Sequence, residues 1–183
     1  AFRRPARRSL SQDDREGSWV DPASITLREL SPDDWQLFRE VRLAALREAA
    51  YAFSSTLEQW QGPNDTEERW RQRLTNVPLN VVAYFNGAPA GMVGATNPSA
   101  AGATELISMW VAPHARGTGV ADALVAAVIA WATERGVNTI ALDVVETNAR
   151  ARAFYRRRGF VDRGRVADPR SAQPERRMLW SRR

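Results

Sequence analysis

Hydrophobic and polar positions along this chain follow two different periods, and the changes of period outline the expected elements. Alternation over 25–30 predicts a first strand, and apolar residues at helical spacing over 37–49 predict a first helix. Ser31 and Pro32 between them are typical of a helix start, since serine caps a helix and proline fits its first turn. A second helix is expected over 66–74, after a Gly-Pro-Asn-Asp turn.

The second half of the chain predicts a strand meander followed by a crossover. Three strands are expected at 80–85, 90–96 and 104–111, and Asn86-Gly87 is a strong hairpin signal between the first two. A helix, a strand, a helix and two strands are then expected, over 120–135, 139–145, 148–158, 160–166 and 176–180. This order predicts an α+β fold whose sheet is mostly antiparallel, with one parallel crossover in the middle.

Composition limits the chain to one domain and narrows its chemistry. Residues 1–24 lack periodic apolar content and predict a mobile extension before a single domain over 25–183. No run approaches the ~18 apolar residues of a membrane helix, and no apolar run follows the basic start, so we expect no membrane association and a cytoplasmic location. The chain has no Cys and one His, so we expect no metal.

The net charge is +5, and all 26 basic residues are Arg. This balance is compatible with an anionic cofactor and also with nucleic acid. A nucleic-acid-binding module remains an alternative function. The basic residues are scattered among acids, however, and no reading helix or base-stacking platform is recognisable, so we expect no nucleic-acid partner.

The most informative segment is the turn that carries Arg116, Gly117 and Gly119 between a strand and a helix rich in small residues. Such a turn exposes backbone N–H groups at a helix N-terminus, where the helix dipole favours an anion. The glycines would let the main chain approach a pyrophosphate, although they are also compatible with a tight turn alone. The turn lacks the Lys-Ser/Thr of a P-loop and the pattern of a dinucleotide site.

Two separated motifs resemble the GNAT superfamily of acyl-CoA N-acyltransferases. Arg116-x-x-Gly119-x-Ala121 is similar to its Q/R-x-x-G-x-G/A pyrophosphate signature. Asn148, Tyr155 and Gly159-Phe160 match a second region of that family, in which Ala153 stands two places later than usual. The resemblance extends from about residue 25 to 180 and implies a mixed sheet with a central, splayed parallel pair flanked by helices.

The resemblance also implies an activity, the transfer of an acetyl group from acetyl-CoA to a primary amine by direct attack in a ternary complex. The strand before the turn would pair its backbone with the pantetheine arm through Met109, Trp110 and Val111. The turn would hold the pyrophosphate through Arg116, Gly117, Thr118, Gly119, Val120 and Ala121. The alternative within the family is a regulatory domain that binds acyl-CoA without catalysis.

Tyr155 is the candidate general acid for the departing thiolate. It follows Asn148 by seven residues, about two helical turns, so both should face the same way. The alternative role for Tyr155 is an aromatic anchor of the helix. Asn148 should cap that helix and by resemblance also contact the cofactor arm. Arg152 could meet the 3′-phosphate of CoA, as could Arg150 and Arg156, or all could be solvated.

By resemblance the general base is Glu105 at the start of the cofactor strand, although a carboxylate there is as often solvated. Asp143 and Glu146 are weaker alternatives. Acceptor specificity would come from 35–70 and 168–174, where aromatic and acidic residues suit an ammonium group or simply belong to the core and surface. A small amine, an antibiotic, a protein N-terminus and a lysine all remain open, as do a monomer and a homodimer.

Overall fold

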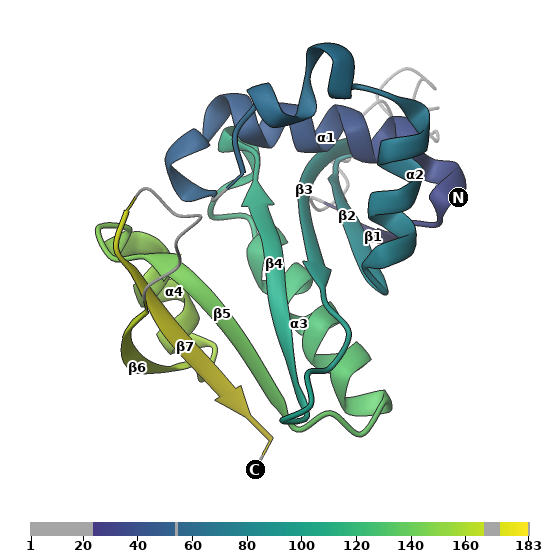
Figure 1. The fold of residues 1–183 in the computed structure, drawn as a ribbon. Coiled ribbons are helices and arrows are strands. Elements are labelled where there is room, and N and C mark those ends of the chain that lie inside the picture. Colours follow the sequence, from purple (N-terminus) through teal and green to yellow (C-terminus); the bar gives the residue numbers. More distant parts are fainter. Residues whose placement is uncertain (1–23, 54, 167–172, 183) are drawn as a thin grey trace, which may run out of the picture.

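The computed structural model describes residues 24–53, 55–166 and 173–182 (Figure 1). The mobile extension predicted for 1–24 lies outside the described residues, apart from Ser24. The described strands form one sheet in the order β1-β2-β3-β4-β5-β7-β6. Their bounds are β1 Ile25–Glu29, β2 Leu79–Phe85, β3 Ala88–Ala95, β4 Ala103–Val111, β5 Thr139–Val145, β6 Val161–Val166 and β7 Glu175–Ser181. The β4–β5 pair is parallel and every other neighbouring pair is antiparallel, which confirms the predicted fold class.

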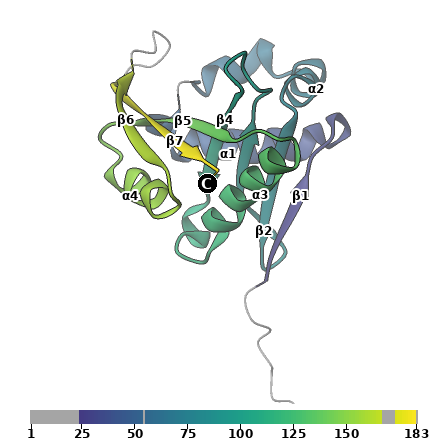
Figure 2. The same ribbon diagram turned by 90° about the horizontal axis from the view of Figure 1, so that it is seen from below.

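Helices cover both faces of the sheet (Figures 1 and 2). One face carries α1 (Trp35–Glu48) and α2 (Glu67–Asn76), and the other carries α3 (Val120–Glu134) and α4 (Ala149–Arg157). Strand β2 shows the consequence, because Val81 and Ala83 pack in the cluster of α3 whereas Val82 packs in the cluster of α1 and α2. Successive residues of a strand point to opposite faces, so a strand covered on both sides has apolar residues on both, and β2 does so with the exception of the buried Asn80.

Local signals in the sequence explain the element ends. Ser31 accepts a hydrogen bond from the Asp33 N–H while the Asp34 side chain accepts one from the Ser31 N–H, a capping box ahead of α1. Asn86 and Gly87 have φ of 51° and 79°, as the tight hairpin turn between β2 and β3 requires. Between α1 and α2 lie three short 3-10 turns, at Ala50–Ala52, Glu58–Trp60 and Gly62–Asn64; the sequence predicted a turn only at the last of them.

Strand β4 separates from β5 after a short parallel contact. The two strands pair only from Ala103 to Glu105 on β4, and beyond that point β5 leaves the rest of β4 unpaired on this side. On its other side β4 pairs with β3, but Ser108 and Met109 together lie opposite one residue, Val93. Ser108 has a positive φ of 56°, so the strand contains a β-bulge. A bulge bends and twists its strand, and the bend explains the opening between β4 and β5 (Figure 1).

Within the described residues, no helix is both long and apolar enough to span a bilayer.

Candidate active site

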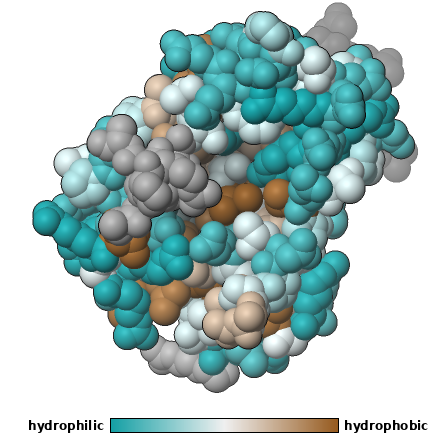
Figure 3. All heavy atoms as spheres, in the orientation of Figure 1, coloured by the Kyte–Doolittle hydropathy of each residue, from teal (hydrophilic) through white to brown (hydrophobic). Residues whose placement is uncertain are grey.

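A cavity of about 330 Å³ lies where β4 and β5 separate. Its walls come from the end of α1 and the turn after it, the end of β4, the turn before α3, and α4. The main lining residues are Ala49, Tyr51, Met109, Trp110, Val111, Ala115, Arg116, Gly117, Gly119, Ala121, Asn148, Arg150, Phe154, Tyr155 and Arg157. On the side seen in Figure 3, hydrophobic residues gather in the hollowed middle and hydrophilic residues surround them. The cavity therefore joins the two motifs that the sequence analysis singled out.

The turn before α3 presents free N–H groups to this cavity. Gly117 and Gly119 have φ of 84° and 98°, a left-handed backbone that favours glycine. The N–H groups of Gly119, Val120 and Ala121 donate no hydrogen bond to another described residue. They begin a helix of 15 residues, so the helix dipole adds to their attraction for an anion. This donor set fits the pyrophosphate of an acyl-CoA.

Two other residues of the predicted phosphate turn bring no side chain to the cavity, and the Thr118 N–H donates to the Ala115 carbonyl oxygen. The Thr118 hydroxyl donates a hydrogen bond to the Ala115 carbonyl oxygen at 2.7 Å. The Val120 side chain is fully buried in the core under α3. Neither side chain lines the cavity.

The Arg116 guanidinium is engaged by the protein itself. It donates to the Val111 carbonyl oxygen at 3.1 Å and to a Glu48 carboxylate oxygen at 2.6 Å. The same Glu48 oxygen accepts a hydrogen bond from the Trp110 ring N–H at 2.9 Å. Burial would raise the pKa of Glu48, but the hydrogen bonds from Arg116 and Trp110 outweigh it and hold the pKa below its usual value. Glu48 thus fastens the end of α1 to the end of β4 and to the phosphate turn.

Tyr155 lies in the wall of the cavity and is itself buried. Its ring packs against Phe154 and Phe160, with centroids 5.3 and 5.5 Å away. Burial raises the pKa of Tyr155, so the phenol keeps its proton at neutral pH. Asn148 lines the same cavity and accepts a hydrogen bond from the Ala151 N–H at 3.1 Å, which confirms that it caps α4. The two residues face the same way, as their spacing predicted.

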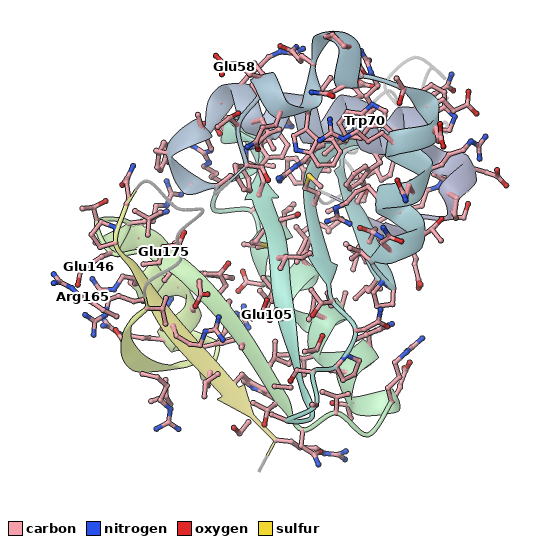
Figure 4. The ribbon with its side chains drawn as sticks, in the orientation of Figure 1. Glu58, Trp70, Glu105, Glu146, Arg165 and Glu175 are labelled. Atoms are coloured by element: carbon pink, nitrogen blue, oxygen red, sulfur yellow. The ribbon has the colours of Figure 1, made fainter. Side chains whose placement is uncertain are left out.

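Glu105 does not line the cavity. It lies on the part of β4 that still pairs with β5, low in the opening of Figure 4, and accepts a hydrogen bond from Arg177 at 3.1 Å. Arg177 also forms an ion pair with Asp143, the weaker alternative for the general base. The structure therefore does not support direct contact between Glu105 and a group bound in the cavity.

Arg152 is turned away from the cavity, contrary to the prediction that it contacts the cofactor. Its guanidinium donates to the Glu146 carbonyl oxygen at 3.0 Å and lies 3.5 Å from the Asp162 carboxylate on β6. Arg150 and Arg157 of the same helix line the cavity instead. The arginine side chain is long enough for its guanidinium to reach Asp162 on β6. Helical spacing within α4 could not predict this contact, because β6 follows α4 in the chain.

Of the aromatic residues expected on the acceptor side, Phe53, Trp60 and Trp70 belong to the core or pack against it, whereas Tyr51 is exposed and lines the cavity. Trp60 and Trp70 stack with centroids 4.6 Å apart, and Trp70 is fully buried with its ring N–H bonded to Asp65 at 2.8 Å. Among the described residues, no group of three or more His, Cys, Asp or Glu is arranged to hold a metal ion.

A sheet split at one parallel pair, with a glycine-containing turn and a helix N-terminus at the split, is the arrangement that the resemblance to the GNAT superfamily implied. The acetyltransferase (GNAT) family model matches residues 41–160, which are 120 of the 183 residues. The chain therefore belongs to the GNAT acetyltransferase family.

Solved structures of acetyltransferases share this fold. The PaiA N-acetyltransferase of Thermoplasma acidophilum, solved in complex with coenzyme A, is 19% identical to this chain and superposes with a TM-score of 0.67. The match covers 87% of this chain and 99% of the PaiA chain. A GNAT-family acetyltransferase of Streptococcus pneumoniae is 21% identical with a TM-score of 0.70, covering 86% and 99%. The ribosomal-protein-alanine N-acetyltransferase of Brucella melitensis is 23% identical with a TM-score of 0.66, covering 86% and 99%. No curated protein matches the sequence.

Proposed function

We propose that this chain transfers an acetyl group from acetyl-CoA to a primary amine, with both substrates bound together. The observation that carries the proposal is the cavity at the split of β4 and β5, which has free N–H groups on one wall and a buried phenol on another. Family membership supports acetyl transfer as the chemistry, and the cavity supplies the anion site and the acid that this chemistry needs.

Different segments of the cavity wall would bind different parts of acetyl-CoA. The N–H groups of Gly119, Val120 and Ala121 would bind the pyrophosphate, and the unpaired β5-facing edge of β4 at Met109 to Val111 would bind the pantetheine arm. Acetyl-CoA supplies the activated acetyl thioester. A backbone N–H of β4 placed at its carbonyl oxygen would polarise that carbonyl.

Two protons move in the reaction. The neutral amine nitrogen forms a bond to the acetyl carbon while the bond from carbon to sulfur breaks, and Tyr155 gives its proton to the leaving thiolate. The raised pKa of Tyr155 suits this role, because the proton is present at neutral pH. The amine loses its own proton to water. Glu105 could receive that proton only through a chain of waters, since Met109 lies four positions farther along β4, about 13 Å in a regular strand.

The test is an assay of free-thiol release with acetyl-CoA and a panel of amines. We expect Tyr155→Phe to lower turnover ~10²-fold, the scale of a lost general acid, with little change in acetyl-CoA affinity. Tyr51→Phe is the matched control, because Tyr51 also lines the cavity but is 56% exposed and should not be needed. Wild-type turnover in Tyr155→Phe would rule out Tyr155 as the acid. CoA binding without thiol release for any amine would favour the regulatory alternative.

A further inference from the structure

Two arginines of the α1–α2 layer are buried without a carboxylate. Arg42 of α1 exposes 6% of its surface, and Arg73 of α2 is partly buried. Neither forms an ion pair with any described residue. Arg39 and Arg71 of the same helices do pair, with Asp65 and with acidic side chains at the surface, whereas the exposed Arg47 and the half-buried Arg69 have no ion pair with a described residue either. What distinguishes Arg42 is its burial: it is the most buried arginine of α1 and α2, and it has no counter-charge among the described residues.

The partners of both guanidinium groups are neutral. Arg42 stacks on the Phe53 ring at 4.6 Å, and its buried Nη1 has no hydrogen-bond partner. Arg73 donates to the Asn80 side-chain oxygen at 3.1 Å and to the Ser108 hydroxyl at 3.3 Å. Burial, with a smaller effect from the charge of Arg73, lowers the pKa of Arg42 to about 10, and burial lowers the pKa of Arg73 to about 10, yet both remain ionised at neutral pH.

An arrangement of this kind is unfavourable for folding alone. A buried charge without a counter-charge costs stability, and two like charges within range of each other add repulsion. An anion between or beside them would remove both penalties. Arg also presents its donors as a fork that matches carboxylate and phosphate oxygens.

The position of Arg42 and Arg73 indicates which substrate would carry the anionic group. Arg73 bonds to Ser108, the bulge residue directly before Met109 on the opened edge of β4. The pair lies in the α1–α2 layer, on the face of the sheet opposite α3, whose N-terminus carries the proposed cofactor turn (Figure 1). A second substrate reaching the split from this side would place its far end near the two arginines.

We propose that Arg42 and Arg73 bind an anionic group, a carboxylate or a phosphate, of the acceptor amine. This assignment rests on the proposed function, because it concerns the second substrate of the same site. It narrows the acceptor to amines that carry a negative charge away from the reacting nitrogen.

The first experiment does not depend on acetyl transfer. Inorganic phosphate and propionate are titrated at low ionic strength while thermal unfolding of the full chain is followed. We expect either anion to raise the Tm of the wild type and of Arg71→Gln, a control on the same helix whose guanidinium is paired at the surface. We expect the shift to be smaller in Arg73→Gln and in Arg42→Met, in which only the phosphate turn before α3 remains to bind the anion. Equal shifts in wild type and Arg73→Gln, or no shift in any variant, would overturn the proposal.

The Tm of each variant without added anion shows whether the substitution itself impairs folding. Arg42→Met keeps the length of the side chain and removes the unpaired charge, so we expect a Tm equal to or above that of the wild type. A markedly lower Tm would show that Arg42 stabilises the core through Phe53 and would count against an anion site. Arg73→Lys keeps the charge and should retain part of the anion response.

The second experiment compares matched acceptors, phosphoethanolamine with ethanolamine and β-alanine with its amide. We expect wild type to favour the anionic member at least ~10-fold in kcat/KM, and Arg73→Gln to lose that preference; a tenfold change corresponds to about 1.4 kcal/mol. Whichever anionic member is preferred identifies a phosphate or a carboxylate. Equal acetylation within both pairs would refute the anion site and leave the proposed function intact. Anion binding without acetylation of any amine would refute the function and leave the site.

Discussion

A substitution at Gly119 tests the phosphate turn most directly, because Gly119 precedes the first residue of α3 and lines the cavity. Its backbone is in the left-handed region. Its φ is 98°, and a Cβ added there would lie 3.4 Å from the Ile25 side chain, an ordinary contact. Gly119→Glu therefore causes little steric conflict. The cost lies in the backbone, since a left-handed L-residue loses about 1–2 kcal/mol. We expect the free energy of unfolding to fall by that amount and the protein to remain folded.

The effect on acetyl-CoA should be larger and of another kind. The new carboxylate stands beside the free N–H groups of Val120 and Ala121, where the pyrophosphate would bind. Two like charges 4 Å apart repel by about 1 kcal/mol in water and about 4 kcal/mol near a protein surface. We take ~3 kcal/mol as the net loss, which raises the Kd for CoA by roughly 10²-fold.

Gly136→Glu is the matched control at the other end of α3. Gly136 has φ of 70° and no atom within 4 Å of an added Cβ, so it suffers the same backbone strain and gains the same charge. Its stability should fall slightly more, by a further 0.3–1 kcal/mol, because a carboxylate is unfavourable at a helix C-terminus. Urea unfolding and calorimetric titration with CoA are measured for both variants. Wild-type affinity in folded Gly119→Glu, or equal loss in both variants, would refute the assignment of the turn.

Two further predictions concern packing and pH. In Gly91→Ala the new Cβ would lie 2.8 Å from the Trp110 carbonyl oxygen, so β4 must shift, and urea unfolding should show a loss of about 1–3 kcal/mol. Hydrogen bonds from Arg39 and, to a smaller extent, from Trp70 lower the pKa of Asp65 from 3.8 to about 2. The ionised Asp65 therefore stabilises the fold above pH 4, and this stabilisation is lost as the pH falls toward 2. Asp65→Asn should thus be less stable than wild type at pH 7, and the difference should vanish near pH 2; a constant difference would contradict this.

Elements whose signals are local could be predicted from the sequence. The hairpin at Asn86-Gly87, the caps at Ser31 and Asn148, and the turn at Gly119 each depend on residues within one turn of the chain, and all are present in the structure. The parallel β4–β5 pair followed from the order of elements, since a crossover helix lies between those strands.

Contacts between distant segments could not be predicted in the same way. Glu48 bonds to Trp110 and Arg116, which lie 62 and 68 residues later, and nothing in the local pattern around Glu48 indicates that role. Arg152 lies close to the face of α4 that carries Asn148, yet its guanidinium follows an ion pair on β6. Helical spacing determines where a Cβ points, but the position of an arginine guanidinium depends on partners that only the tertiary fold brings near.

The bulge at Ser108 shows how one such hidden feature shapes the site. Strand β4 reads as a regular strand in sequence, but Leu106 and Met109 both pack toward α3 although an odd number of positions separates them. Alternation without the bulge would turn Met109 to the other face and Trp110 toward α3. The extra residue therefore directs Trp110 to Glu48 and bends β4 away from β5. Because the Ser108 hydroxyl also accepts a hydrogen bond from Arg73, the residue that opens the cavity is bonded directly to the proposed acceptor site.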